Sequence, residues 1–299
     1  MESPSSAAWR RSTIGHQGVI LVFGKTGQVA RELAQIDGSA RFLSRSEVDL
    51  SKPSSCFDAI MEIQPAAVIN AAAYTAVDTA ESEESIATTI NGEAPGAMSV
   101  ACRRLGVPLV HVSTDYVFNG CGDRPFLPDD GTGPLGAYGR SKLAGEVAIR
   151  EGGAVHVILR TSWVFSSYGN NFVKTMLRLA ETRDQISVVA DQVGGPTSAG
   201  SIASACVAMA MGLQQDTSTS GTYHFSGAPD VSWAEFAREI FRCAAKPTVV
   251  KDIPSSAFPT PALRPSNSRM DCSKLNTFGL RRPDWKRDLI KVISELEKK

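Results

Sequence analysis

An apolar strand that runs directly into a glycine turn is the feature that most constrains this chain. Val19–Phe23 is a short run of β-branched and other apolar side chains. It is followed by the residues Gly24-Lys25-Thr26-Gly27-Gln28-Val29-Ala30, and the helical pattern of Val29–Ile36 begins inside that turn. A buried strand that turns through glycines into a helix is typical of the first unit of a parallel sheet covered by helices.

The same alternation continues along the chain. Further strand-like runs occupy Arg41–Leu43, Ala67–Ile69, Leu109–Val112 and His156–Leu159. Helical patterns occupy Ser54–Ile63, Glu84–Leu105 and Ser141–Arg150. Continuous apolar strands that alternate with helices predict an α/β fold with a doubly wound parallel sheet of the Rossmann type.

After about residue 165 the regular alternation of strand-like and helical patterns is lost. Gly194-Gly195-Pro196, a Ser/Thr-rich stretch at 216–220 and the prolines between Pro254 and Pro265 interrupt the helical patterns. We therefore expect a dinucleotide-binding domain at 18–165 and mainly a smaller C-terminal substrate lobe at 166–299. Part of that lobe, near 200–212, could return to the Rossmann domain. The Ser-rich residues 1–17 are expected to be a disordered tail.

Charge and composition exclude several classes of protein. Lys plus Arg equals Asp plus Glu, at 31 each, so there is no basic excess for nucleic-acid binding. No apolar run is long enough for a membrane span or a signal-peptide core, which predicts a cytoplasmic protein. The six cysteines and four histidines show no metal-ligand spacing, so reduced thiols and histidines in packing or solvated roles are expected.

The glycine turn is suited to a dinucleotide. Its glycines let the backbone approach a pyrophosphate, and the helix N-terminus offers free N–H groups to the anion. The candidate cofactor residues in this turn are Gly24, Lys25, Thr26, Gly27, Gln28 and Val29.

The residues after the second strand bear on cofactor choice. Ser44 and Arg45 stand where an NAD-binding protein usually places an acid for the ribose 2′-hydroxyl. Arg45, helped by Lys25, can pair with a 2′-phosphate, which favours NADPH, with NADH still possible. The alternative is that Arg45 is a solvated loop charge.

Small side chains follow the third strand. The segment Ala71, Ala72 and Ala73 suits close passage of a cofactor at the sheet edge, although tight packing alone would also explain it.

A threonine, a tyrosine and a lysine form the candidate catalytic group. The strand Leu109–Val112 leads into Ser113, Thr114 and Asp115, and Tyr138 and Lys142 follow at helical spacing on one face. A nearby ammonium would lower the pKa of the phenol, so Tyr138 could act as a general acid or base near neutral pH. The Thr114 hydroxyl could orient a substrate oxygen.

These motifs together resemble the extended short-chain dehydrogenase/reductases and, within them, the dTDP-4-dehydrorhamnose reductase family. The resemblance covers about residues 19–299. The segments that carry it are FGKTGQVARELA, NAAAYTAVDTAE, STDYVFNG, YGRSKLAGE, RTSWVF, GNNFVKTMLRLA, DQVGGPTSA and PTPALRPSNSR.

The resemblance implies a role for particular residues. Tyr138 would donate the proton, Lys142 would also hold the nicotinamide ribose, and Thr114 would orient the keto group. Implied substrate contacts are Thr114, Asp115 and Trp163, to which we add Arg264 as a candidate for the diphosphate. Implied cofactor contacts also include Asp49, Leu50, Tyr74 and Val112.

The resemblance further implies reduction of dTDP-4-dehydro-L-rhamnose to dTDP-L-rhamnose, with a nucleotide-linked 4-keto-6-deoxy sugar as the binding partner. Some members of the family are metal-bridged dimers that use two glutamates. Glu32 matches the first, but Gly200 stands at the second, so we assign no metal residues, leave Mg²⁺ dependence open and expect a monomer or homodimer.

Two other functions are compatible with the sequence. An NAD-dependent nucleotide-sugar epimerase or dehydratase would share the fold and the Tyr138/Lys142 pair. A non-catalytic regulator like the regulatory subunit of methionine adenosyltransferase would also share the fold, although the segment around Trp163 favours an enzyme.

Overall fold

The computed structural model describes residues 18–298, so the tail predicted at residues 1–17 lies outside the described residues. Its centre is a six-stranded parallel sheet in the order β10-β5-β4-β3-β1-β2. The strands of this sheet are β1 (Ile20–Phe23), β2 (Arg41–Leu43), β3 (Ala67–Asn70), β4 (Leu109–Thr114), β5 (His156–Thr161) and β10 (Gly221–His224). The predicted doubly wound α/β fold is confirmed.

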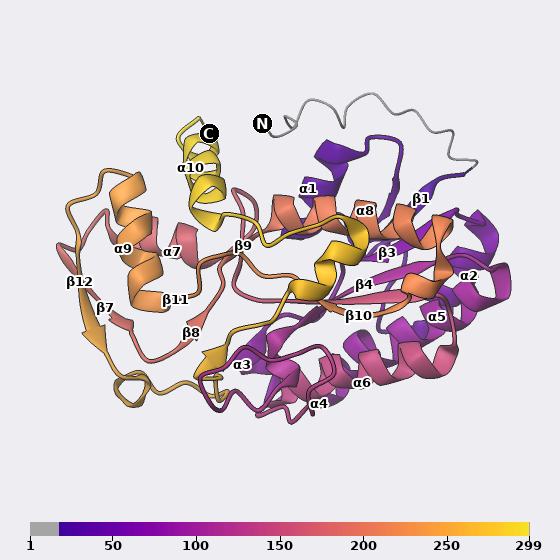
Figure 1. Ribbon diagram of the computed structural model, residues 1–299, viewed down its shortest axis with the longest axis horizontal. Helices are drawn as coiled ribbons and strands as arrows, with labels where there is room; N and C mark the ends of the chain where they lie inside the picture. Colours follow the sequence, from indigo (N-terminus) through magenta and orange to yellow (C-terminus); the bar gives the residue numbers. More distant parts are fainter. Residues whose placement is uncertain (1–17, 299) are drawn as a thin grey trace.

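Helices cover both faces of this sheet (Figure 1). One layer consists of α1 (Gln28–Ile36) and α8 (Ala199–Gln215), and the other of α2 (Pro53–Ile63), α5 (Ala94–Leu105) and α6 (Ala137–Gly152). The apolar sides of the strands face these layers alternately: Val22 and Ile69 pack toward α1 and α8, while Leu21 and Val68 pack toward α2 and α5. Burial on both faces explains why the strands read as unbroken apolar runs.

The helix predicted at Glu84–Leu105 is interrupted. The chain forms α4 (Glu84–Thr88), a π-helical turn at Thr89–Glu93, and then α5. Gly145 of α6 approaches this turn so closely that a Cβ on it would lie 2.0 Å from the carbonyl oxygen of Asn91. The extra residue of the π turn also aims the Asn91 side chain at the backbone of Tyr74. Bulges of this kind are frequent beside functional sites.

A smaller lobe lies beside the carboxyl ends of the strands, at the left of Figure 1. It contains α7 (Phe172–Leu179), α9 (Trp233–Cys243) and α10 (Trp285–Leu296), packed around Phe165, Phe236 and Trp285. Its short strands are β6 (Val164–Phe165), β7 (Gln185–Val189), β8 (Val193–Gly194), β9 (Thr197–Ser198), β11 (Val231–Ser232), β12 (Val249–Ile253) and β13 (Asn267–Ser268).

The main sheet takes elements from both sides of residue 165. Strand β10 pairs with β5, and α8 packs against α1 on the sheet. The 3-10 turn Ser273–Phe278 also joins this core through Leu275. Within residues 18–298, no helix has both the length and the apolar character needed to cross a membrane.

Candidate active site

The predicted site residues gather where neighbouring strands end. Phe23 of β1 lies beside Asn70 of β3, Asn70 lies beside His111 of β4, and Thr114 lies beside Thr161 of β5. The chain leaves β1 toward β2 on one side and reaches β3 on the other. Ligands of open α/β sheets bind in the crevice at such a reversal.

The glycine turn brings its backbone close to the loop after β3 and leaves the start of α1 without a side-chain cap. Gly24 has φ 108°, which favours glycine, and a Cβ there would lie 3.4 Å from the backbone of Ala71. Gly27 is the N-cap of α1 and caps it with no side chain, so no side-chain oxygen of the cap covers the first N–H groups of the helix. Ala71 N donates to Phe23 O at 3.0 Å, which holds the two loops of the crevice together.

The loop after β2 contains a carboxylate that the sequence interpretation missed. Glu47 Oε2 accepts hydrogen bonds from Ser44 N at 2.8 Å and from Ser44 Oγ at 2.7 Å. These bonds, aided by the nearby charges of Lys25 and Arg41, lower the pKa of Glu47. Arg45 has a side chain 82% exposed and lies 3.7 Å from Asp49. Ser44 and Arg45, which are expected to face a 2′-phosphate, therefore face the carboxylates of Glu47 and Asp49 in this structure.

The segment after β3 is fixed by two buried asparagines. Asn70 Oδ1 accepts from Ala72 N at 3.1 Å, and Asn91 Oδ1 accepts from Tyr74 N at 2.8 Å. Val112 of β4 contributes its carbonyl oxygen to this edge, whereas Leu50 is buried in the core that α2 and α5 cover.

Tyr138 and Lys142 lie one turn apart near the start of α6, as the spacing predicts. The Thr114 side chain acts on the Tyr138 phenol and favours its ionised form. Thr114 Oγ1 also donates to Asp115 Oδ1 at 3.0 Å. The structure thus brings the three predicted catalytic residues and Asp115 to the end of β4.

The predicted effect of Lys142 on Tyr138 is wrong in this structure. Burial raises the pKa of Tyr138 to about 12, the Thr114 side chain opposes that rise, and the Asp115 carboxylate adds to it. Lys142 Nζ instead donates to Val112 O at 2.8 Å and lies 3.0 Å from His111 Nε2. Burial lowers the pKa of Lys142 to about 8, against the opposing charge of Glu146.

His111 has a polar role in this site, which corrects the expectation of simple packing or solvation. Its ring is fully buried, and Nδ1 lies 3.0 Å from Asn70 Nδ2. Burial, with the nearby charge of Lys142, holds the pKa of His111 well below its usual value. A histidine inside an otherwise apolar strand was the available sequence signal.

A buried ion pair supports the next turn of α6. Glu146 accepts from Arg160 Nη2 at 2.6 Å and from Arg160 Nε at 2.8 Å. Ser113 Oγ donates to the same carboxylate at 2.7 Å. Burial would raise the pKa of Glu146, but the bonds and charge of Arg160 outweigh it and the pKa is lowered. This cluster fixes α6 against the strand that carries Thr114.

Asp115 is buried and only partly satisfied. Its side chain is 3% exposed, and Oδ2 has no hydrogen-bond partner among residues 18–298. Burial raises the pKa of Asp115 to about 6, although bonds to Ser268 and Thr114 oppose the rise. A buried carboxylate with a free oxygen can accept a hydroxyl group from a ligand.

Trp163 and Arg264 come from the lobe side of the site. Trp163 has φ 50° and stacks on Trp233, with ring centroids 3.6 Å apart. A Cβ on Gly194 would lie 3.0 Å from the Trp163 ring, so this position requires glycine. Arg264 lies 2.9 Å from Asp78, where its charge already has a carboxylate partner.

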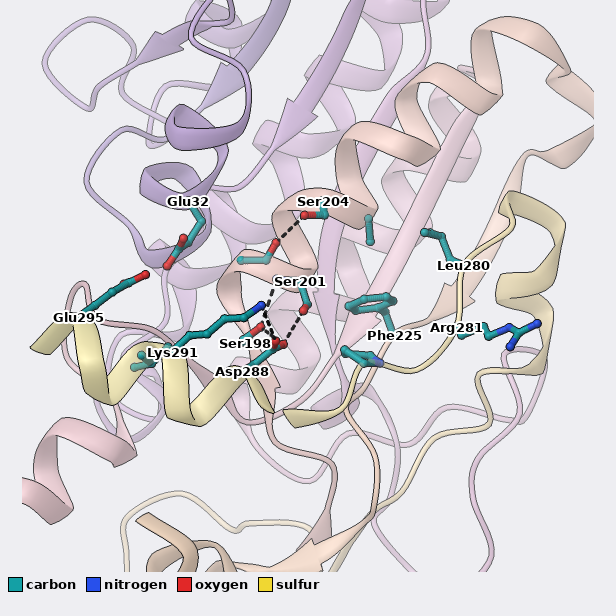
Figure 2. A pocket seen from close by; sticks show the side chains of 14 residues that line it. Glu32, Ser198, Ser201, Ser204, Phe225, Leu280, Arg281, Asp288, Lys291 and Glu295 are labelled. Atoms are coloured by element: carbon teal, nitrogen blue, oxygen red, sulfur yellow. Dashed lines mark hydrogen bonds and ion pairs between the residues drawn. The ribbon is translucent and has the colours of Figure 1, made fainter. Parts of the chain in front are cut away.

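Glu32 lines a separate pocket between α1, α8 and α10 (Figure 2). It accepts from Ser166 Oγ at 2.6 Å, and a Cβ on Gly200 would lie 3.5 Å from Glu32 Oε2. Glu295 lines the same pocket. Within residues 18–298, no three His, Cys, Asp or Glu side chains group as metal ligands. Gly200 has no side chain to supply the second carboxylate of the bridge that the family resemblance implies, and we derive no step through a metal.

Together, the glycine turn, the tyrosine–lysine helix and the small side chains at the sheet edge define the class: an NAD(P)-binding oxidoreductase of the short-chain dehydrogenase/reductase type. Comparison with known proteins narrows this class. The RmlD substrate binding domain family matches residues 18–298. The chain belongs to the dTDP-4-dehydrorhamnose reductase family, which confirms the resemblance seen in the sequence.

Several relatives support this assignment. The dTDP-4-dehydrorhamnose reductase of Sinorhizobium fredii is 44% identical over 92% of this chain and 96% of its own length. That of Escherichia coli K12 is 41% identical over 93% of this chain and 97% of its own length. The crystal structure of the Clostridium acetobutylicum reductase has a TM-score of 0.86 and 35% identity, covering 93% and 99% of the two chains.

Two further structures bear on the cofactor and the fold. The Bacillus anthracis dTDP-4-dehydrorhamnose reductase, solved in complex with NADP, has a TM-score of 0.86 and 34% identity over 94% of this chain and all of its own. A Brucella ovis UDP-glucose 4-epimerase shares only the fold, at 17% identity over 92% of this chain and 96% of its own, with a TM-score of 0.74.

Proposed function

We infer that this enzyme reduces dTDP-4-dehydro-L-rhamnose to dTDP-L-rhamnose in dTDP-rhamnose biosynthesis, at the expense of NAD(P)H. One observation carries the inference within the site: Thr114, which acts on the Tyr138 phenol, ends β4 at the same edge of the sheet as the glycine turn that follows β1. A bound nicotinamide supplies a hydride to C4 of the sugar. The keto oxygen becomes an alkoxide and takes a proton, so both electrons and the proton are accounted for.

We propose Tyr138 as the source of that proton. Because its pKa is about 12, the phenol is protonated throughout the neutral range. An alkoxide is a stronger base than a phenolate, so proton transfer from Tyr138 to the new hydroxyl is downhill. Thr114, whose side chain acts on the phenol, would direct the keto oxygen toward it.

The cofactor is proposed to be NADPH, with NADH as the weaker alternative. The NADP held by the Bacillus anthracis relative supports this choice. In this chain, Lys25 and Arg45 supply positive charge near the loop after β2, while Glu47 competes for the same donors. We expect the 2′-phosphate to replace the Glu47 carboxylate at Ser44.

The lobe is proposed to hold the sugar nucleotide. Trp163, backed by Trp233, offers an aromatic surface, and Asp115 Oδ2 offers an acceptor for a sugar hydroxyl. Arg264 would bind the diphosphate of the sugar nucleotide. To do so it must break its ion pair with Asp78.

The test is NADPH oxidation with a panel of nucleotide-linked 4-keto sugars. We expect stoichiometric oxidation with the dTDP-linked 6-deoxy sugar and formation of dTDP-rhamnose. An epimerase or dehydratase would instead retain and recycle a bound NAD, so spectroscopy of the denatured protein distinguishes it. A non-catalytic regulator would oxidise no NADPH with any sugar in the panel and would capture a stable protein partner.

A further inference from the structure

Lys142 ends a chain of hydrogen bonds that begins at the backbone of Ala72. Ala72 N donates to Asn70 Oδ1 at 3.1 Å, and Asn70 Nδ2 lies 3.0 Å from His111 Nδ1. His111 Nε2 lies 3.0 Å from Lys142 Nζ, which also donates to Val112 O. Asn70, His111 and Lys142 are each at most 1% exposed, so water cannot replace these partners.

The donors and acceptors in this chain fix one another. A backbone N–H can only donate, so the oxygen of Asn70 faces Ala72 and its NH₂ group faces His111. Nδ1 of His111 must then accept. A neutral imidazole with an accepting Nδ1 carries its proton on Nε2, and that proton points at Lys142 Nζ. Only an uncharged amine can accept it.

A charged Lys142 requires the whole chain to reverse. The ammonium would donate to His111 Nε2, the ring proton would move to Nδ1, and the Asn70 amide would rotate to accept it. The NH₂ group of Asn70 would then face the N–H of Ala72, and that donor would lose its partner. The backbone N–H of Ala72 therefore influences the charge of Lys142, which is three hydrogen bonds away.

We propose that Asn70 and His111 are positioning residues that aim an N–H at Lys142 Nζ and so stabilise its uncharged amine relative to its ammonium in the nucleotide-free enzyme. An uncharged Lys142 amine has two N–H groups, and one of them donates to Val112 O. The contacts with Val112 O and His111 Nε2 fix the direction of the other.

Four ionisable groups bear on the residues of this series of hydrogen bonds or on Tyr138 beside them: Glu146, His156, Asp115 and Lys142 itself. Glu146, one turn along α6, favours the charged lysine, whereas burial opposes it and lowers the pKa of Lys142 to about 8. His156 of β5 is the other ionisable group that faces His111. Asp115 acts on Tyr138 from the end of β4.

NMR of the full-length enzyme labelled with ¹³C,¹⁵N-lysine reads the charge of Lys142 directly. Lys142→Arg assigns the signal. We expect a titration midpoint near 8 in the unsubstituted protein. Asn70→Asp should raise it by about one pH unit or more, because a carboxylate accepts from both Ala72 N and a protonated Nδ1 and so makes Nε2 an acceptor. Asn70→Ala, which only releases the ring, should raise it less.

Two controls distinguish an effect carried by the hydrogen bonds through His111 from the effect of simply adding a negative charge. In Asn70→Asp/His111→Leu the ring is missing, so most of the shift should disappear. Asn267→Asp replaces an equally buried asparagine whose amide bonds to Arg124 O, and it should leave the midpoint unchanged. A midpoint of about 10 in the unsubstituted protein, or one that a folded Asn70→Asp does not move, overturns the proposal.

This inference rests on the proposed function only in giving Lys142 a task. The NMR titration uses no sugar, so it can succeed while the reductase assay fails, and the reverse. For the reaction itself, the pH profile of KM for NADPH should shift with the Lys142 midpoint in Asn70→Asp, whereas a purely structural role would lower stability without moving that profile.

Discussion

Arg160 Nη2 lies 2.6 Å from Glu146 Oε2, with the two side chains 2% and 0% exposed. Replacing Arg160 with Met leaves a buried carboxylate without its main partner, so we expect a loss of about 3–5 kcal/mol in the free energy of unfolding. Urea denaturation measures it. Arg140→Met, which breaks a 2.7 Å pair that is 45% and 43% exposed, should cost under about 1 kcal/mol. Equal losses would contradict this interpretation of the buried pair.

Tyr138→Phe should lower kcat by about 10²–10⁴-fold, because it removes the proposed proton donor while the ring still fills its space. NADPH affinity, followed by fluorescence titration, should stay within a few-fold of the original. Turnover close to that of the unsubstituted enzyme in a folded Tyr138→Phe protein would exclude the mechanism.

Lys142→Met should impair turnover and NADPH binding together. The substitution removes the bonds to Val112 O and His111 and also the proposed ribose contact. Steady-state kinetics and fluorescence titration on the same preparation test both. If only turnover falls, the ribose role is wrong.

Arg45→Ala should raise KM for NADPH and leave KM for NADH nearly unchanged, because only NADPH carries the 2′-phosphate. Lys25→Ala/Arg45→Ala should have the larger effect. Glu47→Gln should act in the opposite direction, since it frees the Ser44 donors from a competing carboxylate. Kinetics at low and high salt separate a specific contact from general attraction. An equal response of the two cofactors would make Arg45 a bystander.

Asp115→Asn should stabilise the ligand-free protein at neutral pH. The pKa of Asp115 is raised from 3.8 to about 6, so the folded state binds this proton more tightly than the unfolded state. Its stabilising contribution is therefore complete below pH 3.8 and is lost as pH rises to about 6. A shift of this size corresponds to about 3 kcal/mol at most. Thermal unfolding of both proteins between pH 4 and 7 should show a difference that grows with pH, and a constant difference would refute it.

The sequence predicted those parts of the fold and site that depend on local spacing. The glycine turn sets the entry to α1, and the four-residue separation of Tyr138 and Lys142 places them on one face of α6. Neither depends on the rest of the chain.

The remaining features depend on contacts between distant strands. Asn70 meets His111 only because β3 and β4 pair in parallel, and Glu146 meets Arg160 across the packing of α6 on β5. The pKa of Tyr138 is set by burial, which helical spacing does not encode, and this is why the predicted direction of its shift was wrong.

The participation of β10 in the main sheet has a practical consequence for dissecting this enzyme. A fragment that stopped at residue 165 would leave β5 as an edge strand, with unpaired backbone groups along Val157–Arg160. It would also uncover the apolar surface that α8 shields, including Val110 and Leu159. Such a fragment would be prone to self-association through its open edge. The main sheet should therefore be studied together with the later residues that supply α8 and β10.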